Sequence, residues 1–145
     1  KTSDIKMKKK GFTLTELLAV IAIIGIISLV AVPNIINIVD NIKKQNMIDD
    51  ANKLISLAKM KVNASYAIRK SGYYKFSFSE LNSKGDITIA PDNDNYQSDS
   101  YVEYRISGGN ATYCVYLNST KRRIGTSSSC VNESNLDNKS NVISK

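Results

Sequence analysis

A single carboxylate lies at the beginning of a long apolar segment, and its chemistry needs an explanation. Glu16 follows the basic run Lys8–Lys10 and precedes an almost wholly apolar stretch. Placing an ionised carboxylate in hydrocarbon costs several kcal/mol, roughly 2.5 or more on insertion scales. The sequence has no Lys or Arg between Phe12 and Ile42 that could neutralise it. If the peptide bond after Gly11 were cut, the new α-ammonium of Phe12 would lie about one helical turn from Glu16 and could pair with the Glu16 of a neighbouring copy.

The apolar segment has the length and composition of a membrane-spanning helix. Residues 12–32 form a run of about 21 residues, which at about 1.5 Å per residue would span a hydrocarbon core about 30 Å thick. Its polar members are Thr13, Thr15, Glu16 and Ser28. A secretory signal peptide would end in small residues, and the best candidate, Leu29-Val30-Ala31, lacks one at the first position. A plain membrane anchor would explain the span and the lysines but gives no reason for Glu16.

The sequence Lys-Gly-Phe-Thr-Leu-Thr-Glu at residues 10–16, followed by the apolar run, resembles the class III signal of type IV pilins and pseudopilins. The resemblance implies that a prepilin peptidase cuts between Gly11 and Phe12 and that Phe12 is then N-methylated. Glu16 is the fifth residue after this cut and matches the family glutamate that aids assembly and methylation. The charge argument and the resemblance therefore give Glu16 the same role.

The resemblance also assigns two residues in the helix and the residues before it. Gly25 and Pro33 lie where such proteins carry a helix-loosening glycine and a kinking proline, and proline removes a backbone hydrogen bond from a helix. Residues 1–11 would hold the leader peptide. Because a methionine stands at position 7, translation is expected to begin there, which would leave Met7–Gly11 as the leader. A Gram-positive bacterium is the expected source.

The formal charge of +7 suggests a polyanionic partner until it is divided between the leader and the rest of the chain. Residues 1–11 hold five lysines and one aspartate, a net of +4, so +7 − 4 leaves +3 for the 134 residues after the predicted cut. The leader charge follows the positive-inside rule, which keeps such a segment in the cytoplasm. The remaining cluster Lys121-Arg122-Arg123 could contact phosphate, which keeps DNA as a candidate partner, although three charges in a turn usually form a solvated loop.

The sequence contains no histidine, which removes most general-base and zinc schemes, and we predict no catalytic residue, metal site or cofactor. The run Asp92–Asn95 lacks the glycine and the distal glutamate of a calcium loop and predicts a turn. An even cysteine count outside the membrane predicts one disulfide between Cys114 and Cys130, whose loop of about 17 residues would contribute about 3 kcal/mol. Two free buried thiols, or two ligands of a metal site, are the alternatives.

Helical periodicity continues beyond the apolar segment. Apolar residues recur there at spacings of three and four, with charged residues between them, which is typical of a helix that packs on a sheet. The members of this stripe are Ile48, Ala51, Ile55, Ala58 and Val62. We therefore predict one helix from about Thr13 to about Arg69, ended by Ser71-Gly72 with the glycine in a left-handed conformation.

The rest of the chain shows the patterns of a small sheet. Two alternating runs, residues 101–106 and 111–117, flank Gly108-Gly109-Asn110 and predict a β-hairpin. Within it, Val102, Tyr104 and Ile106 would share one face, and Tyr113, Val115 and Leu117 would face the helix. Residues 86–90 predict a short strand, and the polar residues 132–145 predict a frayed tail.

These elements predict an α+β fold of the pilin kind. One long N-terminal helix, with its first half transmembrane and a kink at Pro33, would pack on a small antiparallel β-sheet. The expected divisions are a leader at 1–11, a transmembrane and filament-core helix at 12–33, an amphipathic half-helix at 34–70, and a globular sheet domain with a polar tail at 71–145.

The resemblance implies a structural subunit of a type IV pilus, which serves adhesion, surface motility or aggregation, and not an enzyme. The expected partners are copies of itself and other pilins, a prepilin peptidase, an assembly ATPase and an inner-membrane platform protein. The ATPase must be a separate protein because the sequence has no Gly-x-x-x-x-Gly-Lys-Ser loop. The precursor would lie in the cell membrane and the mature chain in a cell-surface, extracellular pilus. The alternatives are a pseudopilin or minor pilin of a type II secretion or DNA-uptake system, and a membrane-anchored binding module that never polymerises.

Overall fold

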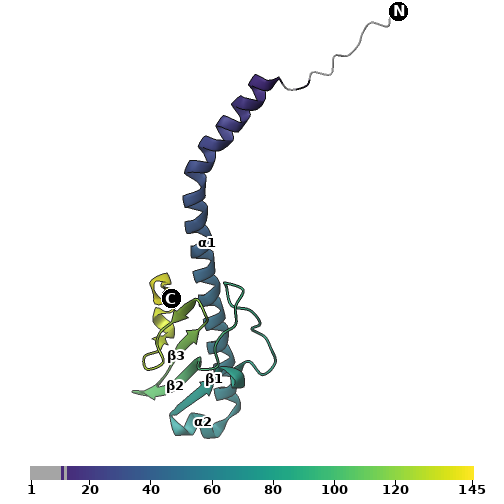
Figure 1. Cartoon of the computed structure of the whole chain (residues 1–145). Helices are drawn as coiled ribbons and strands as arrows, with labels where there is room; N and C mark the ends of the chain where they lie inside the picture. Colours follow the sequence, from purple (N-terminus) through teal and green to yellow (C-terminus); the bar gives the residue numbers. More distant parts are fainter. Residues whose placement is uncertain (1–10, 12) are drawn as a thin grey trace, which may run out of the picture. The chain divides into compact units, whose positions relative to one another are not determined.

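The structure is a computed structural model that describes residue 11 and residues 13–145. It divides into two compact units, Lys1–Val39 and Asp40–Lys145. Helix α1 (Leu14–Ala64) begins in the first unit and ends in the second (Figure 1). All strands and shorter helices in the described part of the chain belong to the second unit.

Within the second unit, α1 packs on the sheet through the predicted stripe. All five predicted stripe residues are buried, with exposed fractions of 3% or less. Met47 and Leu54 also lie in this core and were not predicted. The predicted α+β arrangement, a long apolar N-terminal helix packed on a small antiparallel sheet, is confirmed.

The long helix ends earlier than predicted. α1 stops at Ala64, and a second helix, α2 (Tyr66–Ser71), follows after Ser65. Ser65 has an extended backbone (φ −121°, ψ 108°), and its Oγ accepts a hydrogen bond from the backbone N–H of Ile68 at 3.3 Å. Such an N-cap starts a new helix rather than continuing the old one. Gly72 ends α2 with φ 72°, the left-handed conformation predicted for it.

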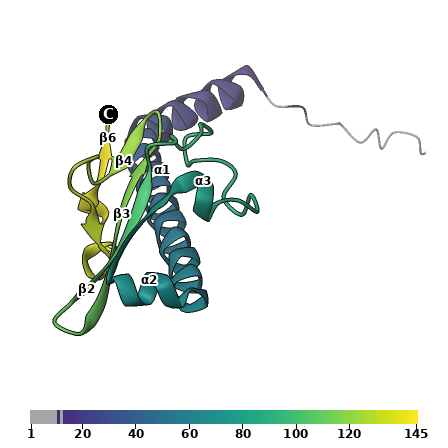
Figure 2. The same ribbon diagram turned by 90° about the horizontal axis from the view of Figure 1, so that it is seen from below.

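The sheet is antiparallel, with strand order β1-β2-β3-β4-β6, and β5 pairs with β3 off this path. Its strands are β1 (Tyr73–Ser77), β2 (Tyr101–Ser107), β3 (Asn110–Asn118), β4 (Arg122–Ile124), β5 (Val131–Asn132) and β6 (Val142–Ser144). A short helix, α3 (Phe78–Leu81), follows β1. Figure 2 shows the sheet beside the second part of α1, which covers its apolar face.

The predicted hairpin is formed by β2 and β3, but its turn is shorter than predicted. Ser107 pairs with Asn110, so only Gly108 and Gly109 lie in the turn, with φ 58° and 83°. Two positive φ angles match the right-handed twist of the strands, and glycine adopts them without strain. In register, Val102 lies opposite Val115.

The predicted inward side of the hairpin is largely confirmed. Val102, Tyr104, Val115 and Leu117 are buried in the core, and Tyr113 packs against it half-buried. Ile106 is exposed. It lies opposite Ala111 near the hairpin turn, beyond most of the core, so its strand position does not bury it.

The strand predicted at residues 86–90 is wrong, because this segment finds side-chain partners instead of a neighbouring strand. The Oδ1 of Asn82 accepts from the N–H of Ile87 at 2.9 Å, and the Nδ2 of Asn82 donates to the carbonyl of Ile87 at 2.8 Å. The N–H of Ala90 donates to the carbonyl of Asp94 at 2.8 Å. Ile87 and Ala90 are therefore buried in an irregular loop.

The frayed tail predicted at residues 132–145 is also wrong. β6 pairs with β4, and the side chains of Leu136 and Val142 are buried. Lys59 of α1 makes an ion pair with Glu133 at 2.8 Å. Two apolar residues and this ion pair hold a segment whose polar composition suggested disorder.

Candidate functional site

Glu16 lies in the first turn of α1, where it makes reciprocal hydrogen bonds with Thr13. The N–H of Thr13 donates to Glu16 Oε2, and the N–H of Glu16 donates to Thr13 Oγ1, both at 3.2 Å. This capping box satisfies two N–H groups that a helix start leaves without partners, and it places the carboxylate at the positive end of the helix dipole. The spacing Thr13-x-x-Glu16 is the sequence signal that predicts such a box.

The predicted processing residues lie directly before this helix. Gly11 is exposed, and a Cβ added there would meet nothing within 4 Å. Phe12, the predicted methylation site, lies outside the described residues. Cleavage after Gly11 and methylation of Phe12 therefore stay predictions.

From its first turn onward, α1 presents an apolar surface that is not packed in the first unit. The large apolar side chains between Leu14 and Val39 are 42% to 80% exposed. The hydroxyl of Ser28 donates to the carbonyl of Ile24 at 2.7 Å, so this polar side chain bonds to its own helix. In the described part of the chain, α1 is the one helix long and apolar enough to cross a membrane, judged by length and composition. Such a surface suits lipid or other helices rather than water.

Gly25 and Pro33 lie inside α1 as predicted, and the helix continues through both. A Cβ at Gly25 would meet nothing within 4 Å, so packing inside the described molecule does not require glycine there. Pro33 has no N–H to donate to the preceding turn. The helix-loosening and kinking roles of these residues stay predictions.

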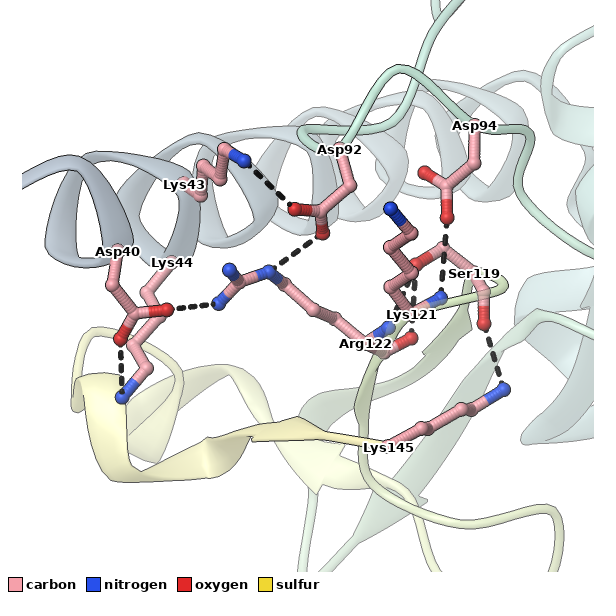
Figure 3. A network of polar contacts seen from close by, with 9 residues as sticks. All are labelled: Asp40, Lys43, Lys44, Asp92, Asp94, Ser119, Lys121, Arg122 and Lys145. Carbon is pink, nitrogen blue, oxygen red and sulfur yellow. Dashed lines mark hydrogen bonds and ion pairs between the residues drawn. The ribbon is translucent and has the colours of Figure 1, made fainter. Parts of the chain in front are cut away.

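A buried arginine joins α1 to two other elements of the second unit. The Arg122 guanidinium donates from Nη1 to Asp40 of α1 at 2.8 Å and from Nε to Asp92 at 2.7 Å. Lys43 pairs with Asp92 at 3.0 Å and Lys44 with Asp40 at 3.4 Å. Figure 3 shows these five alternating charges, which we call the Arg122 cluster. Arg122 is only 8% exposed.

The Arg122 cluster stabilises the charged form of its acids. The hydrogen bond from Arg122 is the largest cause that holds the pKa of Asp40 below its usual value. Burial alone would raise the pKa of Asp92, but the bonds from Arg122 and Lys43 outweigh it and lower this pKa. Burial likewise opposes the charge of Arg122, but the bonds to Asp92 and Asp40 raise its pKa. The cluster is therefore ionised at neutral pH and ties α1 to β4 and to the loop that holds Asp92.

This geometry changes the interpretation of the basic run at residues 121–123. Arg122 is buried in its cluster, and the Nη1 of Arg123 donates to the carbonyl of Gly125 at 2.6 Å. Lys121 remains exposed. A phosphate would therefore meet exposed Lys121 and half-buried Arg123 rather than three exposed cations in a row, and DNA contact here stays a prediction.

A disulfide joins Cys114 of β3 to Cys130, with 5.4 Å between their Cα atoms, in agreement with the predicted pairing. The carboxylate of Glu103 lies 3.8 Å from each sulfur. These three groups are close enough together to hold a metal ion. Metal ligation requires thiolates, and sulfurs bonded to each other do not supply them.

Comparison with known proteins covers the N-terminal part of the chain. Residues 6–32 match the family model of the prokaryotic N-terminal methylation motif. No curated protein and no solved structure matches the chain. The matched residues include the predicted cut, Glu16 and the first part of α1. The motif indicates a precursor like those of type IV pilins and pseudopilins, and the apolar helix fits a membrane anchor for such a precursor.

Proposed function

We propose that the chain is a structural subunit of a type IV pilus, released from its leader after Gly11 and assembled through α1. The observation that carries this proposal is the exposed apolar part of α1, whose first turns, with Glu16, lie inside the matched methylation motif. This surface is joined to a second unit that already has its own buried core. The apolar helix therefore has no fold-stabilising role inside the second unit and is available to lipid or to other subunits.

Assembly would exchange one apolar environment for another. Before cleavage the apolar part of α1 lies among lipid chains, and in a filament it would lie among the same helices of neighbouring subunits. Association of helices from lipid depends on close packing and polar contacts rather than on hydrophobic burial, since lipid is equally apolar. A pair between Glu16 of one subunit and the methylated α-ammonium of Phe12 of another would neutralise the buried carboxylate and fix the register.

We also propose the assembly partners of the chain and its location in the cell. A prepilin peptidase would cut the leader, other pilins would be neighbours, and a separate ATPase with a membrane platform protein would drive assembly. The assembled filament would lie at the cell surface and serve adhesion, surface motility or aggregation. The Gram-positive source stays a prediction, because the matched motif is described only as prokaryotic.

The test is mass spectrometry of the N-terminal peptide in material sheared from the cell surface. We expect a chain that begins at N-methylated Phe12. A chain that keeps its lysines and is found only in membranes would overturn the proposal and leave a membrane-anchored module. Processed chains present at trace level in fibres made mostly of another subunit would instead identify a minor pilin or pseudopilin.

A further inference from the structure

A carboxylate faces the disulfide on the side of the sheet opposite to the buried core residues Val102 and Tyr104. Glu103 of β2 is the register partner of Cys114 of β3. Its Oε2 lies 3.8 Å from the sulfur of Cys114 and 3.8 Å from that of Cys130. Among the described residues, this is the one group of three Cys, Asp or Glu side chains close enough together to share a metal ion. We call these three residues the Glu103 site.

Strand pairing holds the three residues of the Glu103 site together independently of the disulfide. The β2–β3 ladder fixes Glu103 beside Cys114. The β3–β5 ladder places Val115 opposite Val131, so Cys130, the residue before Val131, stays next to Cys114. The two sulfurs would therefore remain neighbours if the bond between them were broken.

The surroundings of Glu103 orient its carboxylate toward the sulfurs. The hydroxyl of Tyr73 donates to Oε1 at 3.4 Å, which leaves Oε2 facing both sulfurs. Such an outer hydrogen bond is the usual means of fixing a carboxylate that binds a metal. The guanidinium of Arg105 lies 3.8 Å from Oε2, and its side chain is 61% exposed. A divalent cation on two thiolates and one carboxylate would leave a net charge of −1, which Arg105 would offset.

The Glu103 site is open to small molecules. Both cysteines are half-buried, and their sulfurs lie in a hollow whose walls also include Thr112, Ser129 and Asn132. A small thiol can therefore reach the disulfide, and a metal ion can reach the same place afterwards.

We propose that reduction of the disulfide by a thiol reductant creates a site for a borderline-soft divalent cation such as Zn²⁺, with Cys114, Cys130 and Glu103 as ligands. Two thiol groups of the reductant supply two electrons and two protons, the bond between the sulfurs breaks, and the reductant becomes a disulfide. The cation then displaces the two thiol protons and binds both thiolates and Oε2 of Glu103. The metal alternative for the two cysteines thus applies to the reduced chain.

The geometry of the Glu103 site fits such a cation. Zinc bonds of about 2.3 Å to sulfur and about 2.0–2.2 Å to oxygen, arranged tetrahedrally, place the ligand atoms about 3.5–3.8 Å apart. The distances of 3.8 Å from Glu103 to the sulfurs lie at this spacing, and rotation of the cysteine side chains would open the third edge. Water from the hollow would supply the fourth ligand. Two thiolates favour Zn²⁺ over Ca²⁺ and Mg²⁺, which prefer oxygen ligands.

The experiment uses the full chain in detergent micelles, reduced with dithiothreitol and then freed of it by gel filtration under argon. Co²⁺ is the probe, because its visible absorption reports tetrahedral thiolate ligation. We expect the reduced chain to bind one Co²⁺, which Zn²⁺ displaces, and the oxidised chain to bind none. Glu103→Gln should weaken Co²⁺ binding to the reduced chain at least tenfold. Glu80→Gln is the matched control, because Glu80 also accepts from a tyrosine hydroxyl, that of Tyr74 at 3.1 Å, but lies outside the site.

Three results would overturn the proposal. They are no visible bands from the reduced chain, equal binding by the oxidised chain, and equal affinity in Glu103→Gln and Glu80→Gln. The last result also covers a reduced chain that has lost its sheet, since two thiols in an unfolded chain would bind Co²⁺ without regard to Glu103. The Glu103 site lies wholly in the second unit, so its failure would leave the proposed function untouched.

Discussion

At the scale of single residues, Glu16 has two partners to consider, one in its own helix and one proposed on a neighbouring copy. The capping box with Thr13 gives the carboxylate a local reason to be there. A helix cap of this kind is worth about 0.5–2 kcal/mol. Glutamine at N3 can also form a capping box, so the cap alone does not require a charge. The two roles can therefore be separated by substitution.

We predict that Glu16→Ala and Glu16→Gln are both inserted and cleaved but are both absent from sheared filaments. The alanine variant loses the charge and the acceptor for the Thr13 N–H but keeps the bond from its own N–H to Thr13 Oγ1, whereas glutamine keeps both bonds and loses only the charge. The measurement compares processed chain in membranes with processed chain in the sheared fraction. Normal filaments from Glu16→Gln would show that the cap suffices and that charge pairing is wrong.

A second prediction concerns Tyr96, whose hydroxyl donates to Asp50 Oδ2 of α1 at 2.5 Å. Removing this donor in Tyr96→Phe leaves a half-buried carboxylate without its partner, and we expect a loss of about 1–2 kcal/mol in the free energy of unfolding. Tyr66→Phe is the control, because Tyr66 is exposed. Urea unfolding of the chain in detergent micelles, followed by tyrosine fluorescence, measures both.

The cost of Tyr96→Phe should depend on pH. Burial raises the pKa of Asp50, and the bond from Tyr96 opposes that rise. Without the bond, the pKa of Asp50 rises further. A carboxyl with a raised folded-state pKa favours the fold most below its unfolded pKa of about 3.9 and loses this contribution as pH rises through the folded value. The variant should therefore lose more stability at pH 7 than at pH 4, and an equal loss at both would contradict this account.

At the scale of elements, features that follow a repeating spacing could be predicted from the sequence. Features that depend on single side chains could not. The stripe on α1 and the β2–β3 hairpin are set by spacing, so their burial could be predicted. The loop at residues 86–90 is held by the side-chain amide of Asn82. Its two hydrogen bonds to the backbone of Ile87 replace those that a neighbouring strand would supply. The Arg122 cluster joins residues far apart in the sequence, and no local pattern indicates that Arg122 is buried.

The Arg122 cluster carries the third prediction. Arg122→Met removes the cation shared by Asp40 and the buried Asp92, and we expect a loss of about 3 kcal/mol, at the lower end for a broken buried ion pair because Asp40 is partly exposed. Lys121→Met is the matched control on the neighbouring residue, which is exposed. Urea unfolding at pH 7 measures both variants. A loss in Arg122→Met no larger than in Lys121→Met would show that the cluster contributes little.

The stability difference between wild type and Arg122→Met should also be smaller at acid pH, although the pKa values of the acids in the cluster are shifted in the opposite direction to that of Asp50. The folded-state pKa values of Asp40 and Asp92 are lowered. Their contribution is present above the unfolded value of about 3.9 and is lost as pH falls through the folded values. The stability gap between wild type and Arg122→Met should therefore narrow below about pH 4, because protonated carboxyls no longer need the arginine.

At the scale of the whole molecule, the two units require different surroundings. The second unit buries its core with residues that all follow Val39, whereas the first exposes apolar side chains along the helix. The folded unit therefore needs no membrane, and the apolar part of α1 needs lipid or other helices. The proposed filament subunit could therefore leave the bilayer without refolding its sheet, because only the first unit would change its surroundings.

The last prediction follows from this division. A fragment that begins at Asp40 keeps the whole core and the Arg122 cluster, and we expect it to be soluble, monomeric and cooperatively folded. A fragment that begins at Gln45 keeps the same core residues but loses Asp40, Lys43 and Lys44. Because Arg122 and Asp92 would keep only each other, we expect this shorter fragment to be less stable by roughly 1–3 kcal/mol. Urea unfolding and sedimentation measure the pair. Aggregation of both fragments would show that the sheet unit depends on the first part of α1, and equal stability would show that the cluster is not what holds the helix to the sheet at this end.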